Sequence, residues 1–486
     1  MRLFSKFGNG IRRNTNRNFM PMKNIFTALL LLSIVSLYSC KTEKKEHVWD
    51  FDEILQADTL NVITLSSSSS YFIYKEEPMG YDYDLVKDFA DHYGLQLNVK
   101  VAENATRLIE MLQAGEGDLI AYPITIQNEL KDSLIYCGPV QISHQVLVQK
   151  ADRGDTLLTD VTELIGKEVY VKHNTKYHQR MMNLNAELGG GIIIEDIDKD
   201  TITAEDLIGM VSEGKIKYTV SDEYVAKLNR TYYRNINISL PLSFDQRSSW
   251  LVRKSTPNLA KALTEWVQQT DNTPVYTAIT KKYFELSKMP FDGEYIVPTN
   301  LPKGSISAYD ELFKRHAKGS EFDWFLLAAM AYQESRFQPN LTSWAGATGL
   351  MGLMPRTAVS LGISVEDRTN PDLSIMASVK LLERLDKLFV RSVPDKNERI
   401  KFVLAAYNGG HGHVYDAQAL ARKYEGDASD WESVRKFLEL KRNPDYYNDP
   451  VVKNGYFRGT ETLNYVVQVI KNRTRFMEKH SAAQGT

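Results

Sequence analysis

The sequence contains little cysteine, no long apolar segment and no excess of charge of either sign. Only two of its 486 residues are cysteines, Cys40 and Cys137. Acidic and basic side chains nearly cancel, 61 against 59, so the whole chain lacks the basic character of a nucleic-acid-binding protein. An apolar run at residues 25–37 is shorter than the roughly 20 residues that span a bilayer. The rest of the chain has the composition of globular proteins, and its length predicts more than one domain.

The N-terminal region is predicted to be a signal peptide that covers residues 1–39. Its short apolar run follows a basic residue, which is typical of a secretory signal. The sequence Leu-Tyr-Ser-Cys that ends at Cys40 resembles a bacterial lipobox, whose cysteine receives lipid and becomes the mature N-terminus. Residues 40–57 would then be a charged tether to the outer membrane, on its periplasmic side. An ordinary signal peptide with an incidental Cys40 is the alternative. With Cys40 lipidated, Cys137 lacks a disulfide partner and is expected to be buried and inert.

Residues 58–284 are predicted to form an α/β domain of two lobes. Strand-like and helix-like segments alternate in two series along this region, which indicates two α/β units. The predicted strands are 60–65, 95–101, 117–121, 168–172, 189–194 and 217–220, and the predicted helices are 84–92, 107–114, 204–213 and 222–228. A proline-containing stretch, residues 285–302, is the predicted linker to a second domain at residues 303–480.

Three short motifs mark the first lobe. They are G-x-D-x-D-L-V from Gly80 to Val86, L-x-x-G-x-x-D from Leu112 to Asp118, and the strand end Thr125-Ile-Gln. Together they resemble the periplasmic solute-binding fold of the amino-acid-binding family. That resemblance implies a regulatory ligand site with Asp82, Thr125 and Asp222, although a helix N-cap explains Asp222 equally well. The family commonly carries an arginine that clamps the ligand carboxylate where this chain has Leu130. A free amino acid is therefore a doubtful ligand.

The second domain begins with a predicted apolar helix that carries a carboxylate. Ser320 and Asp323 suggest a capping box at its start. Apolar residues then recur at helical spacing, and Glu334 falls on their inward face near the C-terminal end. Burial and the negative end of the helix dipole should both raise the pKa of this carboxyl, which suits a general acid. The alternative is a glutamate at the helix edge that pairs with Arg336.

Four motifs follow one another from this helix onward. They are E-S-x-F from Glu334 to Phe337, S-x-A-G-A-x-G-L-M from Ser343 to Met351, A-Y-N from Ala406 to Asn408, and E-T-x-x-Y from Glu461 to Tyr465. In this order they resemble the lysozyme-like lytic transglycosylase domain, in particular the subgroup of membrane-bound lytic murein transglycosylase F. The family usually has glutamine after G-L-M, where this chain has Gly352. This departure affects one sugar contact and not the catalytic acid.

The resemblance implies a multidomain enzyme, with an α/β two-lobed periplasmic-binding-protein-like domain followed by a mainly α lysozyme-like domain. Glu334 would cleave the MurNAc–GlcNAc bond and leave a 1,6-anhydroMurNAc end. The residues that would bind substrate are Ser343, Met351, Tyr407, Asn408 and Tyr465. From the residues alone, an N-cap for Ser343, a turn for Asn408 and a core aromatic for Tyr465 are the favoured interpretations, and the resemblance is what favours a binding role. Apart from Glu461 of E-T-x-x-Y, Glu334 is the one carboxylate in these four motifs, whereas most glycosidases use two, so the N-acetyl group of the substrate is expected to assist.

The expected partners are peptidoglycan strands, a muropeptide ligand and a membrane, with no nucleic acid and no cofactor. The pair His411 and His413 has a spacing seen in some metal sites but lacks a third ligand nearby, so a loop histidine pair is predicted and no metal. Two alternatives to a lyase remain open. One is a peptidoglycan hydrolase that uses water, and the other is a non-catalytic sensor of cell-wall fragments.

Overall fold

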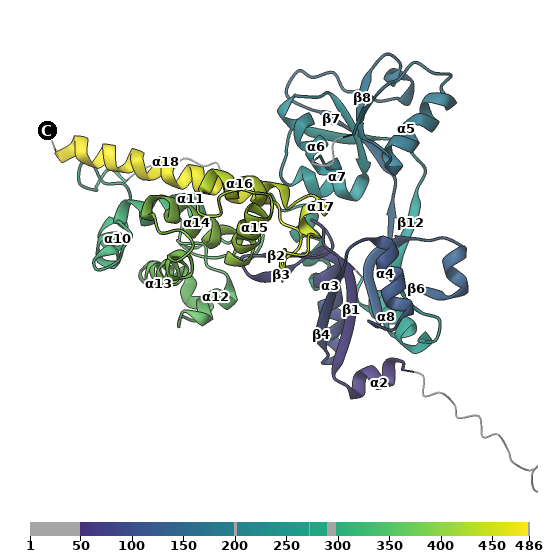
Figure 1. Ribbon diagram of the computed structural model, residues 1–486, viewed down its shortest axis with the longest axis horizontal. Helices are drawn as coiled ribbons and strands as arrows, with labels where there is room; N and C mark the ends of the chain where they lie inside the picture. Colours follow the sequence, from purple (N-terminus) through teal and green to yellow (C-terminus); the bar gives the residue numbers. More distant parts are fainter. Residues whose placement is uncertain (1–48, 199–201, 272, 289–297, 485–486) are drawn as a thin grey trace, which may run out of the picture. The chain divides into compact units, whose positions relative to one another are not determined.

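The computed structural model describes residues 49–198, 202–271, 273–288 and 298–484. All named strands lie before Lys254, and helices dominate from Asp310 onward. Figure 1 shows sheets with flanking helices in the first part of the chain and a packed group of helices in the second. The predicted fold class, an α/β two-lobed domain followed by a mainly α domain, is confirmed.

The first lobe contains a five-stranded sheet with helices on its faces. Its strands are β1 (Thr59–Leu65), β4 (Gln96–Ala102), β5 (Leu119–Thr125), β6 (Leu134–Ser143) and β12 (Gln246–Arg253), and its helices are α2 (Phe51–Gln56), α3 (Tyr81–Tyr93), α4 (Ala105–Gln113), η1 (Glu129–Asp132), α8 (Pro257–Thr270) and α9 (Pro274–Phe284). The strand order is β4-β1-β5-β12-β6. Trp250 and Leu251 of β12 enter different cores, the first with Phe89 and the second with Leu108, because neighbouring strand residues point to opposite faces.

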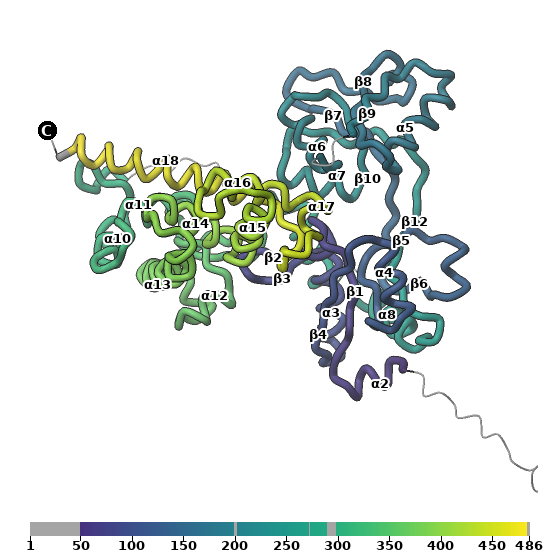
Figure 2. The backbone as a smooth tube through the Cα atoms, viewed as in Figure 1, coloured from purple at the N-terminus to yellow at the C-terminus, as the bar shows by residue number. Residues whose placement is uncertain are grey.

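The second lobe contains another five-stranded sheet, with the order β11-β7-β10-β8-β9. Its strands are β7 (Gln145–Lys150), β8 (Glu168–Lys172), β9 (Ile193–Ile197), β10 (Tyr218–Asp222) and β11 (Ile236–Pro241), and its helices are η2 (Val161–Leu164), α5 (Lys176–Glu187), α6 (Ala204–Glu213) and α7 (Glu223–Arg230). The chain passes between the two sheets from β6 to β7 and again from β11 to β12 (Figure 2). Two crossing segments form the kind of connection about which lobes can close as a hinge.

A short hairpin leaves the first lobe between β1 and α3. Its strands are β2 (Phe72–Tyr74) and β3 (Glu77–Met79), which pair antiparallel. The two turn residues, Lys75 and Glu76, both have positive φ, 47° and 67°. A two-residue turn needs this left-handed backbone for the twist of the strands, and glycine or asparagine usually supplies it. Lysine and glutamate adopt it at a conformational cost, so other contacts must hold the turn.

The second domain is built around a buried central helix, α11 (Trp324–Ser335). The others are α10 (Asp310–Ala317), α12 (Pro355–Ser360), η3 (Glu366–Thr369), α13 (Pro371–Phe389), α14 (Lys396–Gly409), α15 (His411–Lys423), α16 (Trp431–Leu440), α17 (Pro444–Tyr447) and α18 (Gly459–Gln484). Residues 326–331 of α11 are fully buried because α10 and α18 pack against the helix. The predicted capping box is wrong at Ser320, since the side chain that caps α11 is Asp323, which accepts a hydrogen bond from the Leu326 amide at 3.0 Å.

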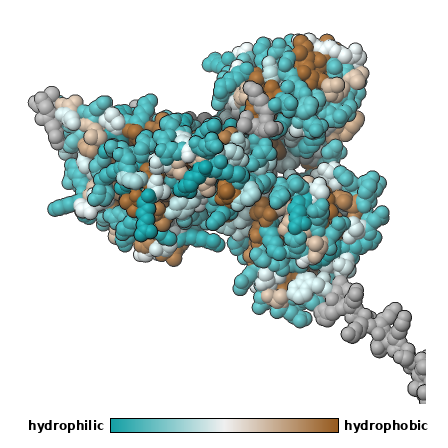
Figure 3. Space-filling view, viewed as in Figure 1, coloured by the Kyte–Doolittle hydropathy of each residue, from teal (hydrophilic) through white to brown (hydrophobic). Residues whose placement is uncertain are grey.

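The surface is mostly hydrophilic on the face that Figure 3 shows, with apolar side chains in small separate groups. Within the described ranges, no helix is both long and apolar enough to span a bilayer. Cys137 is buried, as predicted, and burial raises the pKa of its thiol to about 12, which keeps it in the unreactive thiol form. The predicted signal region, 1–39, and Cys40 lie outside the described residues.

Candidate active site

Glu334 lies in the last turn of α11, where the helix meets a glycine-rich loop. The helix ends at Ser335, and Arg336 follows in the left-handed conformation with φ 49°. The Ser335 hydroxyl lies 3.0 Å from the carbonyl oxygen of Ala331 and 2.9 Å from that of Leu350, so it ties the helix end to the loop. The backbone therefore fixes the direction in which the Glu334 side chain leaves the helix.

The Glu334 carboxyl is nearly enclosed, with 9% of its side chain exposed. Burial raises its pKa, which is the direction that the sequence predicts, while Lys75 and the Tyr465 hydroxyl act against this rise. The Lys75 Nζ lies 3.3 Å from Oε2 and 3.4 Å from Oε1 of Glu334. The site therefore holds an acid whose protonation depends on whether Lys75 is present.

Gly352 gives the Glu334 carboxyl the space that it occupies. A Cβ atom at this position would lie 2.2 Å from Oε2 of Glu334, and the backbone φ of 62° favours glycine independently. The Gly352 carbonyl oxygen also accepts a hydrogen bond from Lys75 Nζ at 3.4 Å. The departure from the usual glutamine thus has a structural reason, because a larger residue at this position would displace the acid.

Three of the predicted substrate-binding residues are tied into the protein around this carboxyl. The Tyr407 hydroxyl lies 2.7 Å from the Met351 carbonyl oxygen and 3.0 Å from the Ser378 hydroxyl, and both Tyr407 and Met351 are buried. Asn408 lies within α14 rather than in a turn, and its side-chain oxygen accepts a hydrogen bond from Thr462 at 2.7 Å. These contacts brace the loop and α14 behind Glu334.

Ser343 and Tyr465 lie on different elements. Ser343 closes the glycine-rich loop, where its backbone N–H donates to the Ala347 carbonyl at 2.8 Å and its hydroxyl accepts from the Ala347 N–H at 3.1 Å. It is exposed and caps no helix. Tyr465 on α18 is buried, and its hydroxyl has no hydrogen-bond partner of good geometry among the described residues. It still lies near enough to Glu334 to favour the ionised carboxylate.

Lys75 is a residue of this site that the sequence analysis misses. It projects from the turn of the hairpin into the second domain, 259 positions before Glu334 in the chain, and only 7% of its side chain is exposed. The hairpin makes further contacts there, because the Ile73 carbonyl oxygen accepts from His413 Nε2 at 2.9 Å and Glu76 pairs with His411. In the sequence, the adjacent charged residues Lys75 and Glu76 could indicate a turn. They could not indicate which part of the protein that turn contacts.

The His411 and His413 pair lies in the first turn of α15 and not in a loop, so that part of the prediction is wrong. His413 is buried, and Lys441 Nζ donates to its Nδ1 at 2.9 Å. Burial, and then the charge of Lys441, hold the pKa of His413 well below its usual value. His413 is therefore neutral and donates from Nε2 to the hairpin.

The predicted regulatory residues divide between a buried position and a cleft. Asp82 is buried and accepts hydrogen bonds from Ser70 and Trp250, both at 2.9 Å, and burial raises its pKa to about 6.

Thr125 and Asp222 line a cleft of about 430 Å³ between the lobes. Asp222 occupies the N-cap position of α7 without capping it, because Lys176 and Tyr177 bind its Oδ2 at 2.5 and 3.1 Å. Leu130, in place of the usual arginine, also lines this cleft.

Two family models match the two parts of the chain. The family described as bacterial extracellular solute-binding proteins, family 3, matches residues 60–286, and the transglycosylase SLT domain family matches residues 311–429. The match to the transglycosylase family contains Glu334 and ends before Tyr465. Among solved structures, substrate binding domain 2 of GlnP from Lactococcus lactis in the open conformation has a TM-score of 0.41 and 19% identity, and covers 47% of this chain and 96% of its own.

A solute-binding type of domain joined to a helical domain with an enclosed glutamic acid defines a lytic transglycosylase with a fused binding domain. Two relatives extend the match over most of the chain. Membrane-bound lytic murein transglycosylase F of Desulfosudis oleivorans is 31% identical over 93% of this chain and 97% of its own. The protein of the same name from Pseudomonas putida is 29% identical over 86% and 84%. The chain belongs to the family of membrane-bound lytic murein transglycosylase F.

Proposed function

We propose that Glu334 is the catalytic acid, and then the base, that cleaves the bond between MurNAc and GlcNAc in peptidoglycan. The activity follows from the family, because the chain is a lytic murein transglycosylase that acts on peptidoglycan. The observation that supports the role of Glu334 is its enclosure at the end of α11, which raises its pKa. A carboxyl whose pKa is raised keeps its proton closer to neutral pH and can donate it.

The reaction uses one carboxyl in two protonation states. Protonated Glu334 gives its proton to the glycosidic oxygen while the bond to C1 of MurNAc breaks, and GlcNAc leaves with a free 4-hydroxyl. The N-acetyl oxygen of MurNAc supports the positive charge at C1. Ionised Glu334 then takes the proton of the 6-hydroxyl as O6 bonds to C1, so the acid is regenerated and no water is consumed. In this proposal Ser343, Met351, Tyr407, Asn408 and Tyr465 surround and bind the sugar.

Mass analysis of the products from purified peptidoglycan tests this proposal. A 1,6-anhydro product is lighter by one water than the product of a hydrolase, so the two alternatives give different masses. Glu334→Gln should lower turnover by about 10²-fold or more, the usual loss when general acid catalysis is removed. Glu321→Gln, which removes an exposed carboxylate paired with Lys396 in the same domain, is the matched control. A Glu334→Gln variant with more than about a tenth of the wild-type turnover would contradict the assignment.

We further propose that a cell-wall fragment bound between the lobes regulates this acid. Lys75 favours the ionised form of Glu334, which cannot donate a proton. The turn of its hairpin, Lys75 and Glu76, also lines a cavity together with Gly352. The hairpin belongs to the first lobe, so a movement of the lobes that withdraws Lys75 would release the acid. A peptide ligand is supported by Lys176, the one cation among the described residues that line the cleft, which could exchange its pairing with Asp222 for a peptide carboxylate.

The protein is membrane-bound and belongs to the cell envelope. We propose that lipid on Cys40 attaches it to the outer membrane, a proposal supported by the apolar run and the lipobox-like sequence before that residue. Cys40→Ser should release the protein from the membrane or leave the precursor uncleaved. Fractionation of cells that express either form measures this, and an unchanged membrane fraction would contradict the lipid anchor.

A further inference from the structure

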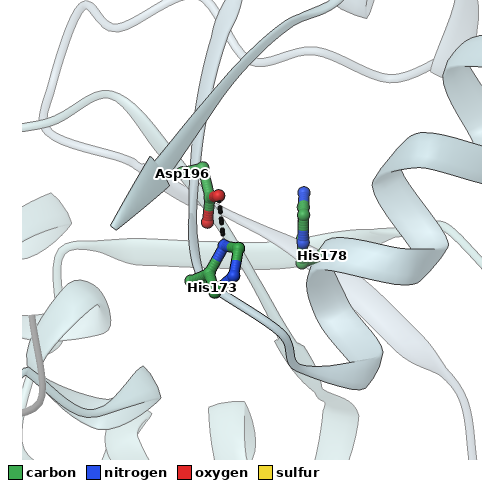
Figure 4. A group of neighbouring side chains, drawn as sticks. All are labelled: His173, His178 and Asp196. Atoms are coloured by element: carbon green, nitrogen blue, oxygen red, sulfur yellow. Dashed lines mark hydrogen bonds and ion pairs between the residues drawn. The ribbon is translucent and has the colours of Figure 1, made fainter. Parts of the chain in front are cut away.

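A group of metal-ligating side chains lies in the second lobe, on elements that the transglycosylase reaction does not use. His173 follows β8, His178 lies in the first turn of α5, and Asp196 lies on β9. One ligand atom from each of the three lies within 4.8 Å of the other two. Figure 4 shows His178 beside the joined pair of His173 and Asp196. Over the described ranges, this is the one group of three histidine, cysteine or acidic residues with such spacing.

The backbone places these three residues together. β8 and β9 are parallel neighbours with Val171 opposite Asp196, and the His173 N–H extends the ladder to the Ile197 carbonyl at 3.0 Å. Asn174 then reverses the chain with a φ of 56°, and Thr175 caps α5 by accepting from the His178 N–H at 3.3 Å. The strand pairing thus positions two of the ligands, and the capped helix start positions the third.

The side chains have the chemistry and the freedom that a metal ion requires. His173 Nδ1 and Asp196 Oδ2 are hydrogen bonded, and the His173 and His178 ring centroids lie 5.6 Å apart. The side chains of His173 and Asp196 are 48% and 33% exposed, so each can turn toward a shared ion. Zinc binds such nitrogen and oxygen atoms at about 2.0–2.2 Å, which small rotations of these side chains would achieve.

We propose that His173, His178 and Asp196 bind a divalent transition-metal ion, with Zn²⁺ as the occupant and water completing its coordination. Two imidazoles and a carboxylate are ligands that suit Zn²⁺, whereas Mg²⁺ and Ca²⁺ prefer oxygen ligands alone. Binding requires a neutral imidazole with a free lone pair. If Nδ1 of His173 is the ligand, the proton that it shares with Asp196 passes to solvent as the ion takes its place.

The ion would fix a segment that borders the ligand cleft. Lys176 and Tyr177 lie between two of the ligands in the sequence, and both hold Asp222. Lys176 and Asp222 also line the cleft. An ion that joins the start of α5 to β9 would restrict this segment, so backbone amides 176–179 should exchange with solvent more slowly when Zn²⁺ is bound. This consequence depends on the metal site alone and not on the proposed regulation.

Isothermal titration of the metal-free, untagged chain with Zn²⁺ tests the site. We expect one ion per chain, and His178→Gln and Asp196→Asn should each weaken binding by at least about tenfold, since even residues that only support ligands lose that much. His144→Gln is the matched control, because His144 forms a similar pair with Asp245 at 2.9 Å but belongs to no group of three ligands within the part of the chain that the structure describes. Its binding should equal that of the wild type.

Cobalt provides a second measurement that reports on the coordination itself. Co²⁺ in a site of low coordination number absorbs visible light strongly, and this absorption should disappear in His178→Gln and Asp196→Asn. Circular dichroism without metal shows whether the variants are folded. Equal Zn²⁺ affinity in the wild type and both variants would overturn the proposal, as would absence of binding to the wild type. Loss of binding on His413→Gln alone would overturn it too, by placing the ion in the other domain.

Discussion

At the scale of single residues, the position of the Glu334 carboxyl depends on the absence of a side chain at Gly352. The carboxyl occupies the volume in which a side chain at residue 352 would begin. We predict that Gly352→Ala moves the carboxyl away from its present position and lowers turnover of peptidoglycan by about 10²-fold, comparable to loss of the acid. Turnover and the melting temperature of the variant should be measured together.

The control for this prediction separates backbone strain from contact with the acid. Gly362 also has a positive φ, 87°, but a Cβ atom there would meet nothing within 4 Å. Gly362→Ala should therefore lose stability to a similar degree, about 1 kcal/mol for a strained backbone, while keeping its turnover. Equal turnover in both variants would show that Gly352 is needed only for its backbone conformation.

At the scale of elements, the hairpin of β2 and β3 brings a cation, Lys75, to the Glu334 carboxyl and so lowers the pKa of that acid. We predict that Lys75→Met raises the rate measured without any added fragment, because the carboxyl loses the cation that favours its ionised form. General-acid activity declines as pH rises through the pKa of Glu334. Removal of a cation raises that pKa, so the alkaline limb of the pH–rate profile should move to higher pH.

Lys87→Met is the matched control for the hairpin, because Lys87 belongs to the same lobe and forms an exposed pair with Asp91 on α3. Its rate and pH profile should not change. If Lys75→Met instead lowers the rate and leaves the alkaline limb in place, Lys75 acts with the substrate, and the hairpin is part of the active enzyme.

The elements also show how far the sequence determines the site. The end of α11 was predictable, because its apolar residues recur at helical spacing and are now found buried around Glu334. The strand predicted at residues 189–194 is instead β9, Ile193–Ile197, since the glycines before it have positive φ and form the turn. The role of Lys75 could not be predicted, because Lys75 and Glu334 are 259 positions apart in the sequence and their ion pair depends on how the two domains pack together. Local sequence patterns contain no information about that packing.

At the scale of the whole molecule, Glu205 joins three parts of the described chain. It lies on α6 of the second lobe, where its Oε1 accepts from the Ser68 hydroxyl of the first lobe at 2.6 Å. Its Oε2 lies 3.3 Å from Arg458 Nη1 of the helical domain. The first lobe reaches the same domain through Lys75. Both lobes therefore contact the helical domain, the first through Lys75 and the second through Glu205. A change in the angle between the lobes must break or strain at least one of these contacts.

This arrangement predicts that Glu205 couples ligand binding to catalysis. A ligand that closes the lobes changes the rate only through a difference in its affinity for the two states, and such coupling is typically about 5–150-fold. Glu205→Ala removes the side chain that contacts both Ser68 and Arg458, and leaves the pair of Asp206 with Arg442. The ratio of rates with and without saturating muropeptide should therefore move toward one, while titration still detects binding. Glu213→Ala is the control, since Glu213 ends the same helix and forms an ion pair with Lys215. If Glu205→Ala responds to muropeptide as strongly as Glu213→Ala does, Glu205 contributes nothing to the coupling. The lobes must then act on the active site through the hairpin or through the remaining contacts of the second lobe, such as Asp206 with Arg442.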